Sequence, residues 1–225
     1  MYKRKRITAV ILGAGNGSRM GISENKVYLP LDTQWIIAHA LTAFATHPYV
    51  DDLILVVRDR EQERMESLAR TQRKPCRIVV GGATRQASVY NAIADLKSEI
   101  VLVHDGARPL VQTACITACI EALRQYDGVI PALPVQERIC SVGKRGENPT
   151  LLTRPLYGAQ TPQCFHTKIL RRCHERHKDD PASTDDSRLL EIEGYKVGIR
   201  AGDAVNIKVT TPLDLLVVRA YLETE

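Results

Sequence analysis

Apolar positions along the chain follow two patterns that alternate. Five short runs are largely apolar and rich in β-branched residues, as expected for strands buried on both faces of a sheet. These runs span residues 7–13, 52–58, 76–82, 99–109 and 127–135. Between them lie segments with the 3.6-residue spacing of amphipathic helices, at residues 35–47, 60–72, 84–96 and 112–126. The alternation predicts a Rossmann-like α/β fold of three layers, with a mostly parallel sheet between two layers of helices.

The alternation is interrupted between residues 136 and 158. Two short extended pieces flank the turn-rich segment KRGENP, residues 144–149. Strand-like pieces on either side of a turn are typical of a hairpin. We therefore predict a β-hairpin arm at about residues 136–158 that leaves the sheet.

After the arm, the helix and strand patterns resume. We expect helices at 167–177, 183–194 and 210–225, and a strand at 195–202. Gly194 would end the second helix, while Thr211 would cap the last helix with Pro212 at its first position. Because no linker rich in Pro, Gly or Ser interrupts the pattern, residues 1–225 are predicted to form a single domain.

Composition and charge exclude several classes of protein. The chain has 225 residues, is 44% hydrophobic and has a formal net charge of +5. Four positive charges lie together at Lys3 to Arg6, so the remainder is nearly neutral and gives no reason to expect a nucleic-acid partner. No apolar run approaches the roughly 20 residues of a membrane helix, and no signal peptide is recognisable. We predict a cytoplasmic protein with no membrane partner.

Cysteine and histidine spacing does not favour a metal site. The six cysteines form no CxxC pair, and Cys115 lies one helical turn before Cys119. This pattern predicts reduced, buried or half-buried thiols and no zinc. His174 and His177 lie three residues apart in a strongly charged segment, for which we expect a solvated helix face.

Unusual residues follow the predicted strands. GAGNGSRMG begins at Gly13 after the first strand, GGATR begins at Gly81 after the third, and HDGARP begins at His104 in the fourth. In parallel α/β sheets, ligands bind in the crevice at the carboxyl ends of the strands. The sequence therefore predicts a ligand site at that edge of the sheet.

Three interpretations of the glycine loop compete. A dinucleotide-binding fingerprint would need a third glycine where Ser18 stands, and an acidic residue where the second strand has Arg58. A Walker-type phosphate loop would need a GK[ST] ending, but Lys26 lies between Asn25 and Val27. A turn that binds no ligand would leave two nearby cations, at positions 19 and 26, unexplained.

A nucleoside triphosphate is the ligand that best suits these residues. Gly13, Gly15 and Gly17 permit backbone conformations and close approaches that a Cβ forbids, and successive amides make a concavity for anions. Arg19 and Lys26 would stabilise charge that develops on a phosphate during substitution. A triphosphate usually binds with Mg²⁺, which requires a nearby carboxylate.

Asp105 is the candidate for that carboxylate, because it stands at the end of a buried strand. A strand-end aspartate also commonly caps its own loop, and this alternative remains open. His104 precedes it and is predicted to be a strand residue that packs below the site.

Seven segments together resemble one enzyme family. They are GAGNGSRMG, NKVYLPL, VGGATRQASVYNAI, VLVHDGARPLV, QTPQCF, STDDSRLLEIEG and GDAVNIKVTTPLDL. Their order is that of the 2-C-methyl-D-erythritol 4-phosphate cytidylyltransferases, whose close relatives are the ribitol 5-phosphate cytidylyltransferases. The resemblance runs from about residue 7 to residue 222. It implies a nucleotidyltransferase fold and attack of a polyol phosphate on the α-phosphorus of CTP, with release of pyrophosphate.

The resemblance also implies roles for individual residues. Arg19 and Lys26 would be catalytic, and Asp105 would bind Mg²⁺ with Asp203 beside it. The implied nucleotide-binding residues are Ala14, Gly15, Gly17, Gly82, Ser88 and Lys208. The implied polyol-phosphate residues are Arg108, Arg138, Arg154 and Thr184. The family is a homodimer in which the hairpin arm of each subunit reaches the partner's site.

The chain departs from the family pattern at three places. Asn25 stands where proline usually precedes the lysine, and Ala83 replaces an acidic residue that contacts the nucleotide. On the arm, Glu137, Arg138 and Cys140 replace an Asp, a Thr and a Lys. Arg138 would clamp a phosphate or point to solvent. Three alternatives therefore stay open: ribitol 5-phosphate as acceptor, UTP or GTP as donor, and a nucleotide-binding module without catalysis.

Overall fold

An eight-stranded mixed sheet forms the centre of the computed structural model, which describes residues 2–15, 25–143, 147, 149–178 and 185–224. Its strands are ordered β10-β7-β11-β6-β1-β4-β5, and β12 also pairs with β7. Their bounds are β1 Ile7–Leu12, β4 Asp52–Val57, β5 Cys76–Val80, β6 Ile100–Asp105, β7 Gly128–Pro134, β10 Tyr157–Ala159, β11 Gln163–His166 and β12 Val197–Ala201. The β5-β4-β1-β6 half is parallel throughout, as the apolar runs predicted.

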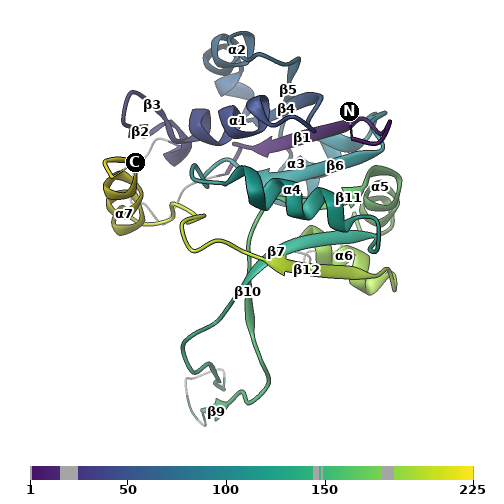
Figure 1. The fold of residues 1–225 in the computed structure, drawn as a ribbon, viewed down its shortest axis with the longest axis vertical. Helices are drawn as coiled ribbons and strands as arrows, with labels where there is room; N and C mark the ends of the chain where they lie inside the picture. The colour runs from purple at the N-terminus through teal and green to yellow at the C-terminus, as the bar shows by residue number, and fades with distance from the viewer. Residues whose placement is uncertain (1, 16–24, 144–146, 148, 179–184, 225) are drawn as a thin grey trace.

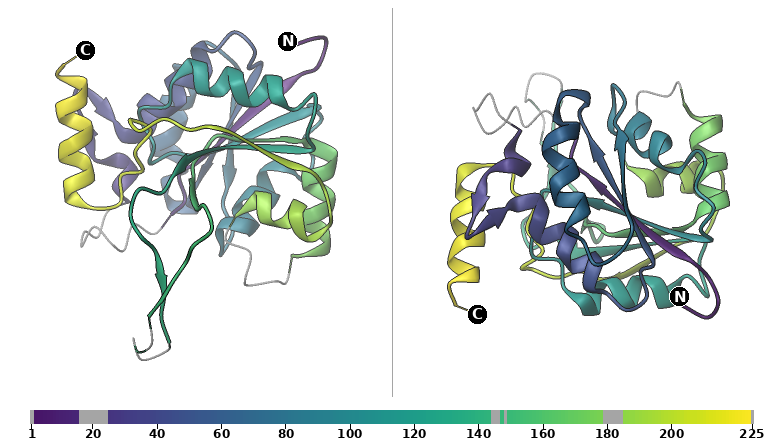
Figure 2. Two further views of the ribbon diagram at one scale, coloured as in Figure 1. Left: turned by 60° about the horizontal axis from the view of Figure 1, so that its bottom comes forward. Right: turned by 90° about the horizontal axis from the view of Figure 1, so that it is seen from above.

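Helices cover both faces of the sheet, so the predicted three layers are confirmed (Figures 1 and 2). The helices are α1 Ile36–Thr46, α2 Gln62–Arg70, α3 Arg85–Ile93, α4 Thr113–Ala122, α5 Thr167–Arg176, α6 Asp186–Ile192 and α7 Pro212–Leu222. Side chains of β1 alternate between the two cores. Ile7 and Ile11 pack with α1, α2 and α4, whereas Val10 packs with α3, α5 and α6. None of the described helices combines the length and apolar character needed to cross a membrane.

The C-terminal segment contains the local signals that the sequence suggested. Gly194 has φ +78°, the left-handed conformation that ends a helix, two residues after α6. Thr211 accepts a hydrogen bond from the Asp214 N–H at the start of α7, and Pro212 occupies the first turn. A separate apolar cluster, which includes Leu31, Leu110 and Val218, packs α7 against the body.

The segment between β7 and β10 extends away from the sheet as a hairpin (Figure 1). Its tip region contains the short antiparallel pair β8 Cys140–Ser141 and β9 Thr150–Leu151. Several apolar side chains on this arm are exposed, among them Val142 at 59% and Tyr157 at 53%. Its role in forming a dimer remains a prediction.

Two strand features were not anticipated. β11 lies antiparallel between β6 and β7, and so separates the two parallel parts of the sheet. It has only four residues and follows Pro162, which gives too short a pattern to recognise. A small ribbon, β2 Pro30–Leu31 and β3 Gln34–Trp35, follows the 3₁₀ turn η2 Lys26–Tyr28.

The prediction of a solvated face at His174 is wrong. On α5 it lies one turn after Leu170, and this spacing places both side chains on the buried face of the helix. His174 is 1% exposed, and its Nε2 lies 3.0 Å from Oδ1 of Asp186. His177 is half-buried against Glu193. All six cysteines are free thiols, as predicted, and five are buried or half-buried, but Cys140 on the arm is exposed, contrary to the prediction.

Candidate active site

A cavity of about 390 Å³ opens at the carboxyl ends of β1, β5 and β6. Seven of the predicted site residues line it: Ala14, Gly15, Lys26, Gly82, Ser88, Asp105 and Lys208. They come together because β1 lies between β4 and β6, with Leu12 in register with Asp105. A hollow of about 480 Å³ at the other end of the strands, beside Arg6 and Ser98, contains none of the predicted residues.

The glycine loop presents open backbone to the cavity. A Cβ added at Gly13 would lie 2.7 Å from Ile37 Cδ1 and 3.0 Å from the Val56 carbonyl, so this glycine is needed for packing. A Cβ at Gly15 would meet no atom within 4 Å. In the part of the chain that the structure describes, the N–H groups of Ala14 and Gly15 donate no hydrogen bond to the protein. These two amides are therefore available to a ligand. Gly17 and Arg19 lie outside the described residues.

The turn from β5 into α3 forms a second wall. The Ser88 hydroxyl accepts a hydrogen bond from the Gly82 N–H at 3.0 Å and donates one to the Thr84 carbonyl at 2.8 Å. A Cβ at Gly82 would lie 2.5 Å from the Ala87 Cβ, a distance that no real Cβ tolerates. Ser88 therefore fixes the shape of this wall, and Gly82 allows α3 to approach it closely.

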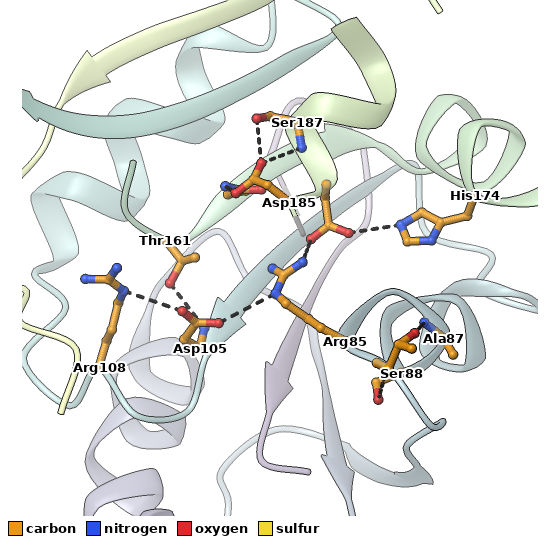
Figure 3. A network of polar contacts seen from close by, with 12 residues as sticks. Arg85, Ala87, Ser88, Asp105, Arg108, Thr161, His174, Asp185 and Ser187 are labelled. Carbon is orange, nitrogen blue, oxygen red and sulfur yellow. Dashed lines mark hydrogen bonds and ion pairs between the residues drawn. The ribbon is translucent and has the colours of Figure 1, made fainter. Parts of the chain in front are cut away.

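Among the described residues, three cations surround Asp105, and two of them, Arg85 and Arg108, are drawn in Figure 3. Its Oδ2 lies 2.8 Å from Lys208 Nζ and 3.7 Å from Arg108 Nε, and its Oδ1 lies 3.9 Å from Arg85 Nε. Burial by itself would raise the pKa of the Asp105 carboxyl, but the cations outweigh burial and hold this pKa well below its usual range. Asp105 is consequently an ionised carboxylate at neutral pH.

Beneath Asp105, a buried hydrogen-bond chain fixes the end of β6. The Thr161 hydroxyl accepts from the Asp105 N–H at 3.1 Å and lies 2.9 Å from His104 Nδ1. The other ring nitrogen of His104, Nε2, lies 3.0 Å from the Arg108 carbonyl, which can only accept. Burial lowers the pKa of His104 to about 4, so the ring is neutral. His104 packs below the site, and Thr161 was not anticipated from the sequence.

Arg85 joins the site to a buried acidic residue on the neighbouring helix. Its Nη1 lies 2.6 Å from Asp186 Oδ2, while its Nε faces Asp105 (Figure 3). Asp186 is 1% exposed and also contacts His174. Sequence reasoning missed this role of Arg85. The available signal was an arginine three residues after the glycine pair, together with two adjacent aspartates at the start of α6.

Other predicted residues are not brought to the cavity. Asp203 is absent from the described residues that line it, and its Oδ1 accepts the Val205 N–H at 3.0 Å. Arg108 contacts Asp105 but is not among the described residues that line the cavity, and its guanidinium donates to the Asn206 carbonyl at 2.7 Å. Arg138 and Arg154 lie exposed on the arm. Thr184 lies outside the described residues.

The side chains at the cavity fit a magnesium ion that arrives with a nucleotide. The described residues contain no group of three or more His, Cys, Asp or Glu side chains able to hold a metal by themselves. Mg²⁺ bound to a nucleotide needs only one or two carboxylates, because phosphates and waters supply its other ligands. Asp105 can serve as one such carboxylate, whereas Asp203 is not among the described residues that line the cavity, and its Oδ1 accepts the Val205 N–H.

Comparison with known proteins gives one family. Residues 7–224 match the model of the IspD family, described as 2-C-methyl-D-erythritol 4-phosphate cytidylyltransferase. A curated protein of that name from Alkaliphilus metalliredigens is 38% identical, with 99% of this chain and 95% of that protein covered. One from Bacillus cereus is 37% identical over 97% and 98% of the two chains.

Solved structures agree with the sequence comparison. The crystal structure of 4-diphosphocytidyl-2C-methyl-D-erythritol synthase from Anaerococcus prevotii has a TM-score of 0.87 and 27% identity, and covers 97% of this chain and 96% of its own. The enzyme from Thermus thermophilus has a TM-score of 0.79 and 26% identity, with 95% and 98% covered. Both similarities extend over nearly the whole chain. The chain therefore belongs to the 2-C-methyl-D-erythritol 4-phosphate cytidylyltransferase family.

Proposed function

We propose that this chain transfers a cytidylyl group from CTP to 2-C-methyl-D-erythritol 4-phosphate. A phosphate oxygen of the acceptor forms a bond to the α-phosphorus, the bond between the α-phosphorus and the bridging oxygen breaks, and pyrophosphate leaves. The supporting observation is that one cavity is lined by Ala14 and Gly15, whose N–H groups donate no hydrogen bond within the described chain, by Lys26 and by the Asp105–Lys208 pair. Amides and cations together suit a triphosphate.

Positioning and charge stabilisation supply the catalysis. The acceptor phosphate is already ionised, so the reaction needs no general base, and neutral buried His104 is not placed to be one. The amides of the glycine loop bind phosphate oxygens, and Lys26 and Lys208 stabilise negative charge on the phosphorus and on the departing pyrophosphate. By resemblance to the family, Arg19 acts with Lys26, and Ala14, Gly15, Gly17, Gly82 and Ser88 bind the nucleotide.

Magnesium is part of the proposal. Asp105 would hold the ion, which when bound neutralises phosphate charge and favours departure of pyrophosphate. Lys208 and Arg85 keep Asp105, which lines the cavity, ionised and oriented.

We also propose that the acceptor site is completed by a second copy of the chain. Arg138 and Arg154 lie on the exposed arm, and no described part of the same chain reaches from them to the cavity. In a homodimer the arm of one protomer would supply these cations to the acceptor phosphate in the partner's cavity, with Thr184 and Arg108 on the cavity side. Exposed apolar side chains on the arm, such as Val142 and Leu151, would be covered in that dimer.

The test is release of pyrophosphate by the purified protein with Mg²⁺ and CTP. 2-C-methyl-D-erythritol 4-phosphate is expected to support turnover well above ribitol 5-phosphate, and CTP above UTP or GTP. If ribitol 5-phosphate supports turnover and 2-C-methyl-D-erythritol 4-phosphate does not, the chain is instead a ribitol 5-phosphate cytidylyltransferase. Binding of CTP without turnover on any acceptor would contradict the proposal and support a nucleotide-binding module.

A further inference from the structure

Three side chains on the outer side of the glycine loop form a small buried network, which we call the loop clamp: Asn25, Arg58 and Glu61. Glu61 belongs to the 3₁₀ turn η3 Asp59–Glu61, which follows β4, and is 8% exposed. Its carboxylate lies 3.5 Å from Arg58 Nη1, and it accepts from Asn25 Nδ2 at 3.3 Å. It also accepts the Arg58 N–H at 3.4 Å. One buried carboxylate thus orients two donors from different segments.

Both donors reach the backbone of the glycine loop. Asn25 Nδ2 donates to the Gly13 carbonyl at 2.6 Å. The Arg58 guanidinium donates to the Ala14 carbonyl at 3.4 Å and also to the Gly15 carbonyl. Three successive carbonyls of the loop are therefore held by the clamp.

Fixing those carbonyls also fixes the amides. In a trans peptide, the C=O of one residue and the N–H of the next point to opposite sides. With the Gly13 and Ala14 carbonyls bound to the clamp, the N–H groups of Ala14 and Gly15 are turned away from it. These same N–H groups donate no hydrogen bond within the described chain, and they belong to two residues that line the cavity.

The clamp reaches the candidate catalytic lysine as well. Asn25 immediately precedes Lys26 and is 1% exposed, and its Oδ1 accepts the Val27 N–H at 3.4 Å. The single amide group of Asn25 therefore connects the start of the lysine segment to the glycine loop. Neither Arg58 nor Glu61 lines the cavity among the described residues, so the two act only through the groups they hold.

We propose that Glu61, through Asn25 and Arg58, is a positioning residue that aligns the glycine-loop amides and Lys26 for the phosphates of the nucleotide. This inference rests on the proposed function. A glycine-rich loop without the clamp would sample many orientations, and aligning it would cost conformational entropy each time a nucleotide binds. Loss of the clamp should therefore weaken binding of the triphosphate and leave binding of a nucleoside without phosphates unchanged.

The experiment measures affinities for CTP with Mg²⁺ and for cytidine, by calorimetry, in the wild type and three variants. Glu61→Gln keeps the size of the side chain and removes its charge, and Asn25→Ala removes the shared amide. Glu66→Gln is the matched control, because Glu66 lies on the next helix with its side chain 52% exposed and paired to Arg70. We expect Glu61→Gln and Asn25→Ala to weaken CTP binding about tenfold and leave cytidine binding unchanged. Turnover should fall roughly tenfold to a hundredfold, and Glu66→Gln should match the wild type.

Several results would overturn the inference. Unchanged CTP affinity in both clamp variants would do so, as would an equal loss of CTP and cytidine affinity. If both clamp variants lose thermal stability together with CTP affinity, the role of the loop clamp is in folding. If the wild type turns over and both clamp variants match it in CTP affinity and turnover, the positioning role of the clamp is contradicted and the proposed function stands. If the wild type binds CTP more tightly than cytidine but shows no turnover, only the proposed function is contradicted. If the wild type binds CTP no more tightly than cytidine, the proposed function and the positioning role are both contradicted.

Discussion

The ammonium of Lys208 lies 2.8 Å from Oδ2 of Asp105, so among the described ion pairs of this carboxylate at the end of β6 the loop before α7 supplies the shortest. Both side chains line the cavity, and Lys208 is 38% exposed whereas Asp105 is 13% exposed. The pair is thus accessible to a ligand from the side of Lys208. We therefore expect Lys208 to bind a phosphate oxygen, in addition to supporting the ionised state of Asp105.

Replacing Lys208 should therefore affect turnover far more than folding. Lys208→Met keeps most of the length of the side chain and removes its charge. We expect turnover to fall about a hundredfold, because a preorganised cation facing the reacting phosphates is lost. The urea midpoint should stay close to that of the wild type, since the side chain is partly exposed. Lys97→Met, at the opposite end of the strands, is the control, and similar losses in both variants would contradict the assignment.

Two glycines of the same loop should respond differently to alanine. Gly13→Ala places a methyl group against Ile37 and the Val56 carbonyl, and should lower the free energy of unfolding by about 1–3 kcal/mol. Gly15→Ala meets no protein atom and should leave the free energy of unfolding within about 0.5 kcal/mol of the wild type. CTP affinity should nonetheless fall in Gly15→Ala, because the methyl group occupies space that the phosphates need.

Urea unfolding and CTP calorimetry on both variants provide the measurement. Gly158→Ala is a suitable control, because a Cβ there meets only the Leu133 carbonyl at 3.9 Å, far from the cavity. If Gly15→Ala binds CTP as tightly as the wild type does, the glycine loop is a turn without a ligand.

The sequence predicted the parallel half of the sheet because its strands are buried on both faces and therefore appear as continuous apolar runs. Once β1 and β6 are adjacent and parallel, their final residues Leu12 and Asp105 must lie side by side, and the site at the strand ends follows. Much of the cavity lining was predictable for this reason, together with the resemblance of its motifs to a family.

The remaining features depend on contacts that no local pattern encodes. Arg85 and Asp186 are separated by 101 positions, and they meet only because α3 and α6 pack on the same face. The buried amide of Asn25, which stands where the family pattern has proline, reaches Glu61 across 36 positions. Asp203 was placed beside the metal by resemblance, but its turn directs its carboxylate to the Val205 N–H.

The Arg85–Asp186 pair yields a prediction for two variants and their combination. Arg85→Met leaves Asp186, 1% exposed, with His174 as its remaining side-chain partner, and we expect a loss of about 3–5 kcal/mol in the free energy of unfolding. Adding Asp186→Asn removes the uncompensated charge and should restore much of that stability. Turnover should stay low in the double variant, because Asp105 still lacks the guanidinium that faces it.

Urea unfolding of the wild type, both single variants and the double variant measures the coupling between the two residues. Stability losses that simply add would show that Arg85 and Asp186 act independently. Full recovery of turnover in the double variant would show that Arg85 serves folding only and has no part in orienting Asp105.

Stability should also depend on pH through His104. Burial lowers its pKa to about 4 in the folded chain, against an ordinary value of 6.5. Between these two values the unfolded chain binds more protons than the folded chain, so stability rises with pH across this window. The contribution of His104 is therefore complete above about pH 6.5 and falls away toward pH 4, by roughly 3 kcal/mol in all.

The measurement is the free energy of unfolding in urea at several pH values from 4 to 7.5. His104→Gln is the comparison, since glutamine retains hydrogen-bonding groups near Thr161 but does not titrate. Burial also lowers the pKa values of His47 and His166, so the wild type contains their contributions as well, and the difference between wild type and variant isolates His104. We expect the wild type to lose more stability than the variant as the pH falls. Parallel curves would mean that His104 already accepts a proton in the folded chain, which would contradict its neutral hydrogen-bonding role beneath Asp105.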